Sequence, residues 1–296
     1  MESSPPQATK HPTAWGVACG TGAALFWALG FVAARQGDDV GLSPIVIALH
    51  RYVWPGLVLL PVLASGRVGD LGAVWWRRAV LLALFGGLPL ALSSYLGYLF
   101  VPLGHGAIIQ PSCAALGGLI LARLVLKEAL PLRRVAGATA IVIGLMVIGS
   151  EALRTMGGHG VLGDLLFVAA GSFFAIFGML VRMWRVDALR AATITSTLSL
   201  AALPLLALSF DNMLAAGFYE NLMQAVVQGL LAGAGATYLF ARAVVLLGAS
   251  RAVLFPSLVP PFTLLVGYLA LGEVPSGLQL VGLVVVVVGF QLTQKG

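Results

Sequence analysis

The chain has 296 residues, of which 59% are apolar and only 9% are charged. Soluble domains average about 45–50% apolar and about 25% charged residues. The mean hydropathy of +1.00 agrees with this contrast. The composition therefore excludes disordered chains, disulfide scaffolds and ordinary soluble enzymes, and it leaves a polytopic helical membrane protein.

Ten apolar runs follow a polar, proline-rich segment at residues 1–13, which we expect to be a cytoplasmic tail. A membrane helix needs about 20 residues, so ten of them use nearly the whole chain and leave no length for a soluble domain. The runs also lack the alternation of a membrane β-barrel. The ten predicted spans are 15–34, 42–64, 79–100, 105–126, 135–149, 161–183, 188–210, 222–247, 252–271 and 278–293.

The lysines and arginines predict the orientation of these spans. If the N-terminus is cytoplasmic, fourteen of the 17 basic residues fall on the inner side, Arg35 and Arg154 fall outside, and Arg51 lies within the second span. Basic residues favour cytoplasmic loops. We therefore expect a multi-pass protein of the cell inner membrane with both termini cytoplasmic. The net charge of +6 is scattered between apolar runs, so no nucleic-acid partner is expected.

An internal repeat relates the two halves of the chain at an offset of 145 residues. The informative matches are a shared Pro-Ser, a shared Glu after the span, and a shared pair of glycines. They predict a first five-helix repeat at 14–149 and a second at 150–296. Because five is odd, the second copy is inverted, a design that recurs in secondary transporters. The matched pairs are Pro111 with Pro256, Ser112 with Ser257, Glu128 with Glu273, Gly137 with Gly282, and Gly144 with Gly289.

This pattern resembles the drug/metabolite transporter superfamily, and within it the ten-helix EamA-type exporters. The resemblance covers the chain from about residue 15 to 293, and it is strongest to the bacterial aromatic-amino-acid exporters. It implies an all-α membrane fold of ten helices in two inverted five-helix repeats. It also implies a cavity lined mainly by spans 1, 3, 4, 6, 8 and 9, with the other spans contacting lipid or a second subunit.

Two prolines inside apolar runs are candidates for a hinge or gate. Pro111 and Pro256 each remove a backbone donor, and the freed carbonyl needs a partner or a wet cavity. A tolerated packing kink is the alternative. Span nine also contains Pro260 and Pro261, so we expect a stronger bend there than in span four.

Aromatic and small polar residues on the implied cavity helices are the candidate substrate contacts. Rings suit the side chain of an amphipathic substrate, while hydroxyls and amides suit its charged groups. Helix–helix packing is the alternative role for each of them. The candidates are Trp27, Ser94, Tyr95, Tyr98, Gln110, Ser112, Phe177, Tyr238 and Ser257.

Few charged residues lie inside the spans. Asp164 and His105 sit near the outer ends of their spans and are the candidates for carrying a proton. Arg51 lies about a third of the way into span two, where intramembrane arginines are costly. Because span two is not expected to line the cavity, we assign Arg51 a structural role, with its long side chain reaching the interface.

Two further sets of repeat-related residues are expected to hold helices together. Glu128 and Glu273 each follow a span, and we expect them to cap the next helix or form a cross-helix salt bridge. Gly137 with Gly144, and Gly282 with Gly289, place small residues on one face of spans five and ten. That face joins helices either within the chain or between subunits of a homodimer.

No catalytic, nucleotide-binding or metal-binding motif is present, and Cys19 and Cys113 read as small packing residues. We expect no enzyme activity, no metal and no cofactor. The predicted function is export of aromatic or neutral amino acids, or similar small amphipathic metabolites, by alternating access. A proton-coupled multidrug exporter is the first alternative, and a membrane-embedded enzyme or lipid-handling protein is the second.

Overall fold

The computed structural model describes residues 12–65, 76–97, 99–101, 103–150, 160–204, 209–272 and 274–294, and within them it contains helices and no strand. The helices are α1 (Pro12–Asp39), α2 (Pro44–Ala64), α3 (Trp76–Gly86), α4 (Leu88–Gly97), α5 (Leu103–Leu124), α6 (Leu132–Ile148), α8 (Val161–Met183), α9 (Ala188–Leu198), η2 (Ser199–Ala202), α11 (Phe210–Ala216), α12 (Phe218–Gln224), η3 (Ala225–Gly235), α13 (Ala236–Leu247), α14 (Ala249–Ala252), η4 (Phe255–Leu258), α15 (Val259–Leu271) and α16 (Gly277–Gln294).

Seven helical stretches in the described part are long and apolar enough to cross a membrane. Large apolar side chains on the outside of the bundle remain exposed, for example Leu124, Leu132 and Leu269, each more than 70% exposed. Such a surface needs lipid around it. The seven stretches are Thr13–Asp39, Pro44–Ala64, Trp76–Gly97, Val161–Met183, Phe218–Leu247, Ala249–Ala270 and Gly277–Gln294.

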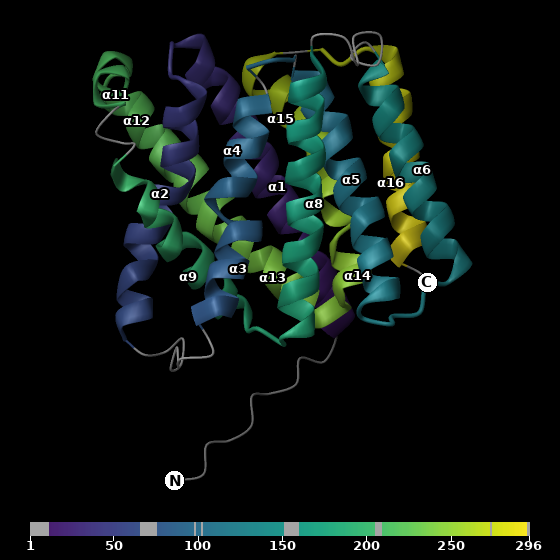
Figure 1. Cartoon of the computed structure of the whole chain (residues 1–296). Coiled ribbons are helices and arrows are strands. Elements are labelled where there is room, and N and C mark those ends of the chain that lie inside the picture. The colour runs from purple at the N-terminus through teal and green to yellow at the C-terminus, as the bar shows by residue number, and fades with distance from the viewer. Residues whose placement is uncertain are drawn as a thin grey trace.

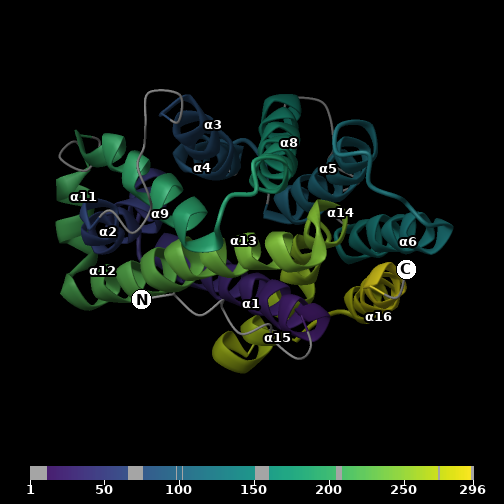
Figure 2. The same cartoon turned by 90° about the horizontal axis from the view of Figure 1, so that it is seen from below.

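The helices stand side by side in one bundle (Figure 1). The start of α1 and the end of α16 lie at the same end of the bundle, and we call this end the terminal side. Viewed from the terminal side, α1 and α13 cross the middle and the other helices surround them (Figure 2). The core accordingly forms where α1 contacts α13, η3 and α15.

Glycines join α6 to α16 at one edge of the bundle (Figure 2). A Cβ atom at Gly144 would lie 2.9 Å from the carbonyl oxygen of Gly282, and one at Gly289 would lie 2.8 Å from that of Gly137. No side chain larger than hydrogen fits there without displacing backbone. The predicted glycine face is therefore used within the chain, between spans five and ten.

The two Pro-Ser segments have different backbones. α5 continues through Pro111 without interruption. The repeat-related segment is divided into α14, the 3₁₀ helix η4 that includes Pro256, and α15. The stronger distortion expected for span nine is present, and Pro260 and Pro261 lie in the first turn of α15.

Other boundaries differ from the predicted spans. α1 begins at Pro12, before the predicted start at residue 15. The seventh predicted span, 188–210, is an α-helix only to Leu198 and continues as η2. The third span is divided between α3 and α4 at Gly87, and Leu88 N, at the start of α4, donates to the Ser199 hydroxyl. Apolar content marks a span but does not reveal such breaks.

Candidate functional site

A cavity of about 490 Å³ lies among the helices. On one side its lining reaches Arg35 near the end of α1, Gly149 after α6, and Gln279 at the start of α16. These positions are at the end of the bundle opposite the terminal side (Figure 1), which we call the open side. Towards the terminal side the lining stops near mid-helix, at residues such as Trp27 and Phe177. The cavity thus reaches one face of the bundle and not the other.

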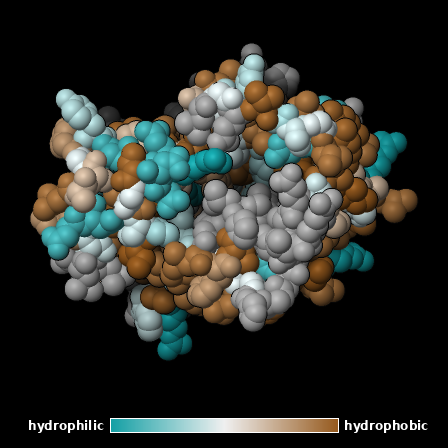
Figure 3. Space-filling model, turned by 90° about the horizontal axis from the view of Figure 1, so that it is seen from above, coloured by the Kyte–Doolittle hydropathy of each residue, from teal (hydrophilic) through white to brown (hydrophobic). Residues whose placement is uncertain are grey.

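The space-filling view from the open side shows a hollow near the centre of that face (Figure 3). Hydrophilic side chains gather beside this hollow, while much of the outer rim is hydrophobic. This distribution suits a wet pocket inside a lipid-facing wall.

Four aromatic rings form the inner part of the cavity, and we call them the aromatic floor. Trp27 meets Phe174 edge-on with ring centroids 5.3 Å apart, and Phe174 lies 4.4 Å from Phe240. Phe177 stacks on Phe240 at 6.2 Å. All four line the cavity. Edge-to-face and tilted contacts of this kind pack the four rings into one apolar surface.

Polar side chains occupy the wall above the aromatic floor. Gln228 is fully buried behind this wall and is not itself a lining residue, and its amide nitrogen donates to the carbonyl oxygen of Gly30 at 2.6 Å. Its amide oxygen accepts from Arg51 at 3.2 Å and from the Tyr95 hydroxyl at 3.4 Å. Nearby, the Ser94 hydroxyl donates to the amide oxygen of Gln110 at 2.9 Å. This wall can orient the polar end of a bound molecule.

Gln228 lies in η3, a π-helical stretch between α12 and α13. π-Helical turns inside α-helices are frequent at functional sites. Here the altered winding accompanies a close approach to α2, because a Cβ at Gly229 would lie 3.0 Å from the carbonyl oxygen of His50. Span eight is thereby held against span two beside the cavity.

Several predicted site residues line the cavity, and others do not. Tyr238 is 39% exposed on the outside of the bundle, and Ser257 is buried and donates to the carbonyl oxygen of Leu254. Ser112 lies off the cavity wall, with a buried hydroxyl that has no hydrogen-bond partner within the described part. The predicted residues on the wall are Trp27, Ser94, Tyr95, Gln110, Pro111, Phe177 and Pro256.

The remaining candidates divide into two groups. Tyr98 and the side chain of His105 lie outside the described residues. Asp164 is described but is not among the lining residues. No predicted proton carrier is therefore brought to the cavity wall by the part of the structure that is described.

The helices implied by the resemblance supply most of the cavity lining, and further helices add to it. α2 contributes Arg51 and Tyr52, and α9 contributes Thr195 and Ser196. Helices in one bundle pack at an angle, so a span at the rim can still reach the cavity with one turn. The expected place of Arg51 is corrected in the same way: it lies on the cavity wall, and its bond to Gln228 agrees with the structural role assigned to it.

Phe240 and Ser196 were missed by the sequence reasoning, although a signal was available. The offset of 145 residues relates Tyr95 to Phe240 and Arg51 to Ser196. In each pair both members line the cavity. A search for repeat partners of the singled-out residues would have found them.

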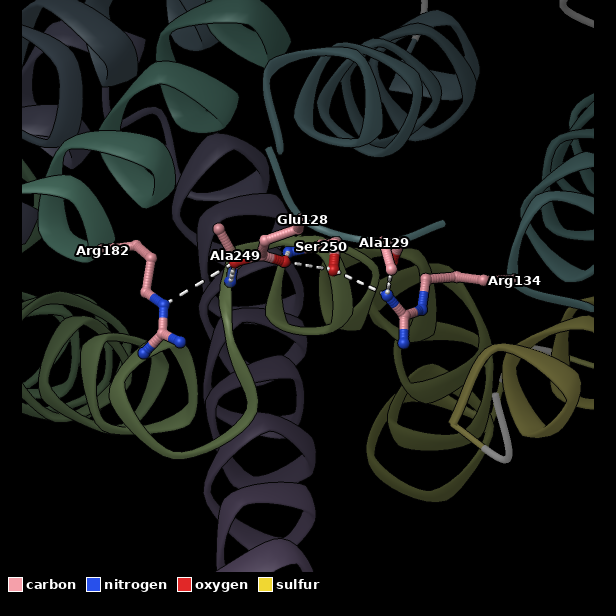
Figure 4. Close-up of polar contacts among 6 residues, drawn as sticks. All are labelled: Glu128, Ala129, Arg134, Arg182, Ala249 and Ser250. Carbon is pink, nitrogen blue, oxygen red and sulfur yellow. Dashed lines mark hydrogen bonds and ion pairs between the residues drawn. The ribbon is translucent and has the colours of Figure 1, made fainter. Parts of the chain in front are cut away.

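Polar contacts gather around Glu128 between the ends of several helices on the terminal side (Figure 4). One carboxylate oxygen of Glu128 accepts from the Ser250 hydroxyl at 2.6 Å and from Ser250 N at 3.3 Å, and the other accepts from Ala249 N at 3.3 Å. Arg182 Nε lies 3.7 Å from this second oxygen. Arg134 donates to the Ser250 hydroxyl at 2.9 Å. We call these residues the Glu128 cluster.

The Glu128 cluster connects both halves of the chain. Glu128 and Arg134 flank the start of α6, whereas Arg182 ends α8 and Ser250 lies in α14. Gly248 precedes α14 with a φ of 86°, a conformation that favours glycine, and a Cβ there would lie 3.3 Å from the Glu128 carboxylate. The expected cross-helix ion pair of Glu128 is present. The expected cap of the next helix is not: α6 has Pro131 at its N-cap without a side-chain bond, and the Glu128 carboxylate caps α14 instead. Its repeat partner Glu273 lies outside the described residues.

A multi-pass helical bundle with a pocket that reaches one face has the architecture of a membrane transporter. Comparison with known proteins agrees. The sequence profile of the EamA-like transporter family matches residues 14–150 and 161–293, so the chain belongs to the EamA-like transporter family. A crystal structure with 19% sequence identity superposes with a TM-score of 0.70, covering 96% of each chain, which shows a shared fold. None of the curated proteins matches the sequence.

Proposed function

We propose that the protein is a secondary transporter that moves small amphipathic molecules across the inner membrane by alternating access. The observation that carries this proposal is the one-sided cavity. It reaches from the aromatic floor to the open side, while the Glu128 cluster holds the two halves together on the terminal side. In alternating access, a central site is exposed to one side of the membrane at a time.

The proposed topology is ten spans in two inverted repeats, with both termini in the cytoplasm. The two separate stretches matched by the family profile support the duplication. The shared end for the start of α1 and the end of α16 supports an even number of spans. With the termini inside, the described state has its cavity open to the outside and its cytoplasmic end closed.

The proposed substrates are aromatic or neutral amino acids, or metabolites of similar size and polarity. The aromatic floor offers contact to an apolar side chain. The hydrogen-bonding wall above it, with Ser94, Gln110 and Tyr95, offers partners to a polar head. A cavity of about 490 Å³ is within the range of small-molecule sites, about 300–1,000 Å³.

Counterflow in proteoliposomes tests the proposal. Vesicles loaded with an unlabelled amino acid should take up the labelled one transiently and saturably, whereas protein-free vesicles should not. Counterflow without a pH gradient indicates a facilitator, and a strict requirement for the gradient indicates proton coupling. No counterflow of any amino acid would remove the substrate assignment.

Two adjacent residues of α13 provide a matched pair of variants. Thr237 lines the cavity, and Tyr238 points to the outside. Thr237→Trp fills part of the cavity and should reduce counterflow by about tenfold or more, since small displacements at a binding site cost that much. Tyr238→Trp should retain the wild-type rate. Equal rates for the two variants would show that this cavity is not the transport route.

A further inference from the structure

Arg51 is the deepest charged group on the cavity wall. It is the eighth residue of α2 and lies beside Gly30, because a Cβ at Gly30 would be 3.2 Å from its guanidinium nitrogen. Arg35, the other cavity-lining arginine, lies five residues after Gly30 on α1, which places it about 7.5 Å nearer the open side. Arg51 therefore sits between the mouth and the aromatic floor.

The partners of Arg51 are neutral. Its guanidinium donates to the Gln228 amide oxygen at 3.2 Å and interacts with the Tyr52 hydroxyl. Among the residues that the structure describes, no carboxylate lies within ion-pair distance of Arg51. A guanidinium has five donors and a permanent positive charge, and its fork geometry matches a carboxylate. An arginine at membrane depth normally faces a partner or a water-filled cavity.

The surroundings hold Arg51 in place. Gln228 is fully buried and anchored by its bond to the Gly30 carbonyl oxygen. The neighbouring His50 is 1% exposed and hydrogen-bonds to Trp54 at 2.7 Å and to Asn221 at 3.0 Å. Fixed neighbours of this kind give a binding group a single orientation, which is what a preorganised site requires.

The aromatic floor lies within reach of a molecule held at Arg51. Trp27 is three residues before Gly30 on α1, about 4.5 Å closer to the terminal side. One benzene ring with a short carboxylate-bearing arm spans such a separation. Among the described lining residues there is no aspartate or glutamate, so the charge of Arg51 attracts anions.

We propose that Arg51 binds the carboxylate of the substrate, so the transporter selects carboxylate-bearing apolar molecules and rejects cationic amphiphiles. This inference rests on the proposed transport function and specifies its substrate class. Zwitterionic amino acids are accepted through their carboxylate. Amines of the same shape are rejected because their charge faces Arg51 without a compensating acid on the described wall.

Four phenyl compounds of similar size test the selectivity in detergent-purified protein. Phenylacetate is an anion, L-phenylalanine a zwitterion, 2-phenylethanol neutral and phenethylamine a cation. We expect phenylacetate and L-phenylalanine to bind more tightly than 2-phenylethanol, and phenethylamine to bind most weakly, as measured by calorimetry or ligand-dependent thermal stabilisation. Tighter binding of phenethylamine than of phenylacetate would overturn the proposal, as would no binding of the two carboxylates.

Substitutions test whether Arg51 is responsible for the preference for carboxylates. Arg51→Gln should weaken phenylacetate binding by about ten- to a hundredfold and leave 2-phenylethanol binding unchanged, because a hydrogen-bonded charge is lost. Arg51→Lys keeps the charge and should retain the preference for anions. Arg77→Gln removes an equal charge from an exposed position of α3 and should have no effect. Unchanged phenylacetate binding in folded Arg51→Gln would contradict the proposal.

Transport of the same compounds separates this inference from the proposed function. Counterflow of phenethylamine but not of phenylacetate would leave a transporter standing and remove the anion selectivity. If no compound shows counterflow, the transport proposal fails, and the binding order in detergent still decides the role of Arg51.

Discussion

The two Pro-Ser segments carry the same dipeptide and adopt different backbones. Around Pro111, α5 remains one helix of 22 residues. Around Pro256, the chain passes from α14 through η4 into α15. A single proline removes one donor, whereas Pro256, Pro260 and Pro261 remove three within six residues. The comparison teaches that the neighbours of a proline decide whether a membrane helix bends or breaks.

The difference in backbone between the two Pro-Ser segments lies at the cavity. Pro111 and Pro256 both line it, on opposite halves of the chain. Identical halves would give a pocket that reaches both faces or neither. The unequal segments instead accompany a cavity that reaches one face, and substitutions can test that association.

Replacing each proline by alanine should have the largest effect, and we expect the two variants to change stability in opposite directions. Pro111→Ala restores a donor inside a continuous helix and should stabilise the protein by about 1–3 kcal/mol. Pro256 is the second residue of the 3₁₀ helix η4, where its fixed φ is already suitable, so Pro256→Ala should destabilise by about 0.5–1 kcal/mol. Melting temperatures in detergent measure both. A shift of the same sign in both variants would contradict this interpretation.

Glu128 connects the two segments, because it follows α5 and accepts bonds from the start of α14. Glu128→Gln removes the charge that caps α14 and pairs with Arg182, at a cost of about 1 kcal/mol. Both side chains are partly exposed, which limits the contribution of the ion pair. The population open on the terminal side should rise about fivefold, measured as labelling of Cys at position 249.

Asp211→Asn is the matched control, since it removes the same charge from an exposed residue of α11 at the other end of the bundle. Labelling at position 249 should remain at the wild-type level in this variant. Equal labelling in Glu128→Gln and Asp211→Asn would show that the Glu128 cluster does not hold the terminal side closed.

Substituting the serines of the two Pro-Ser segments, Ser112 and Ser257, should have the smallest effect on stability. Ser257 donates to the Leu254 carbonyl oxygen at 2.5 Å, so Ser257→Ala should destabilise by about 0.5–1 kcal/mol. The Ser112 hydroxyl is buried without a partner in the described part, so Ser112→Ala should be neutral or slightly stabilising. Thermal unfolding of the two variants in parallel measures the difference, and equal losses would argue against it.

Composition and the lengths of the apolar runs predict much of the fold because they depend on averages over many residues. The membrane class, the helical content and the stronger distortion near Pro256 follow from apolar runs and proline positions. The break between α3 and α4 does not, and at that break Leu88 N bonds to Ser199 from a distant helix. Contacts of that kind are set by packing and leave no local pattern.

The candidate site was predicted less completely for a related reason. In helices that are apolar all round, the hydrophobic pattern does not tell which face is inward. Thr237 lines the cavity while Tyr238 faces outward, although both stand in the same apolar run. Arg51 was assigned to the rim because its span was expected to lie there. Its actual place follows from the packing of α2 against η3 through Gly229 and Gly233.

Thiol accessibility from the two sides of the membrane tests alternating access most directly. Single cysteines would replace Leu264, which lines the cavity, and Ala249, which is 4% exposed in the Glu128 cluster, in a background with Cys19 and Cys113 changed to alanine. Oriented vesicles would receive a membrane-impermeant reagent from either side, with and without transported substrate. The account predicts that position 264 reacts from the open side, that position 249 reacts from the terminal side, and that substrate changes the two rates in opposite directions. Simultaneous access to one site from both sides, or rates that substrate leaves unchanged, would contradict it.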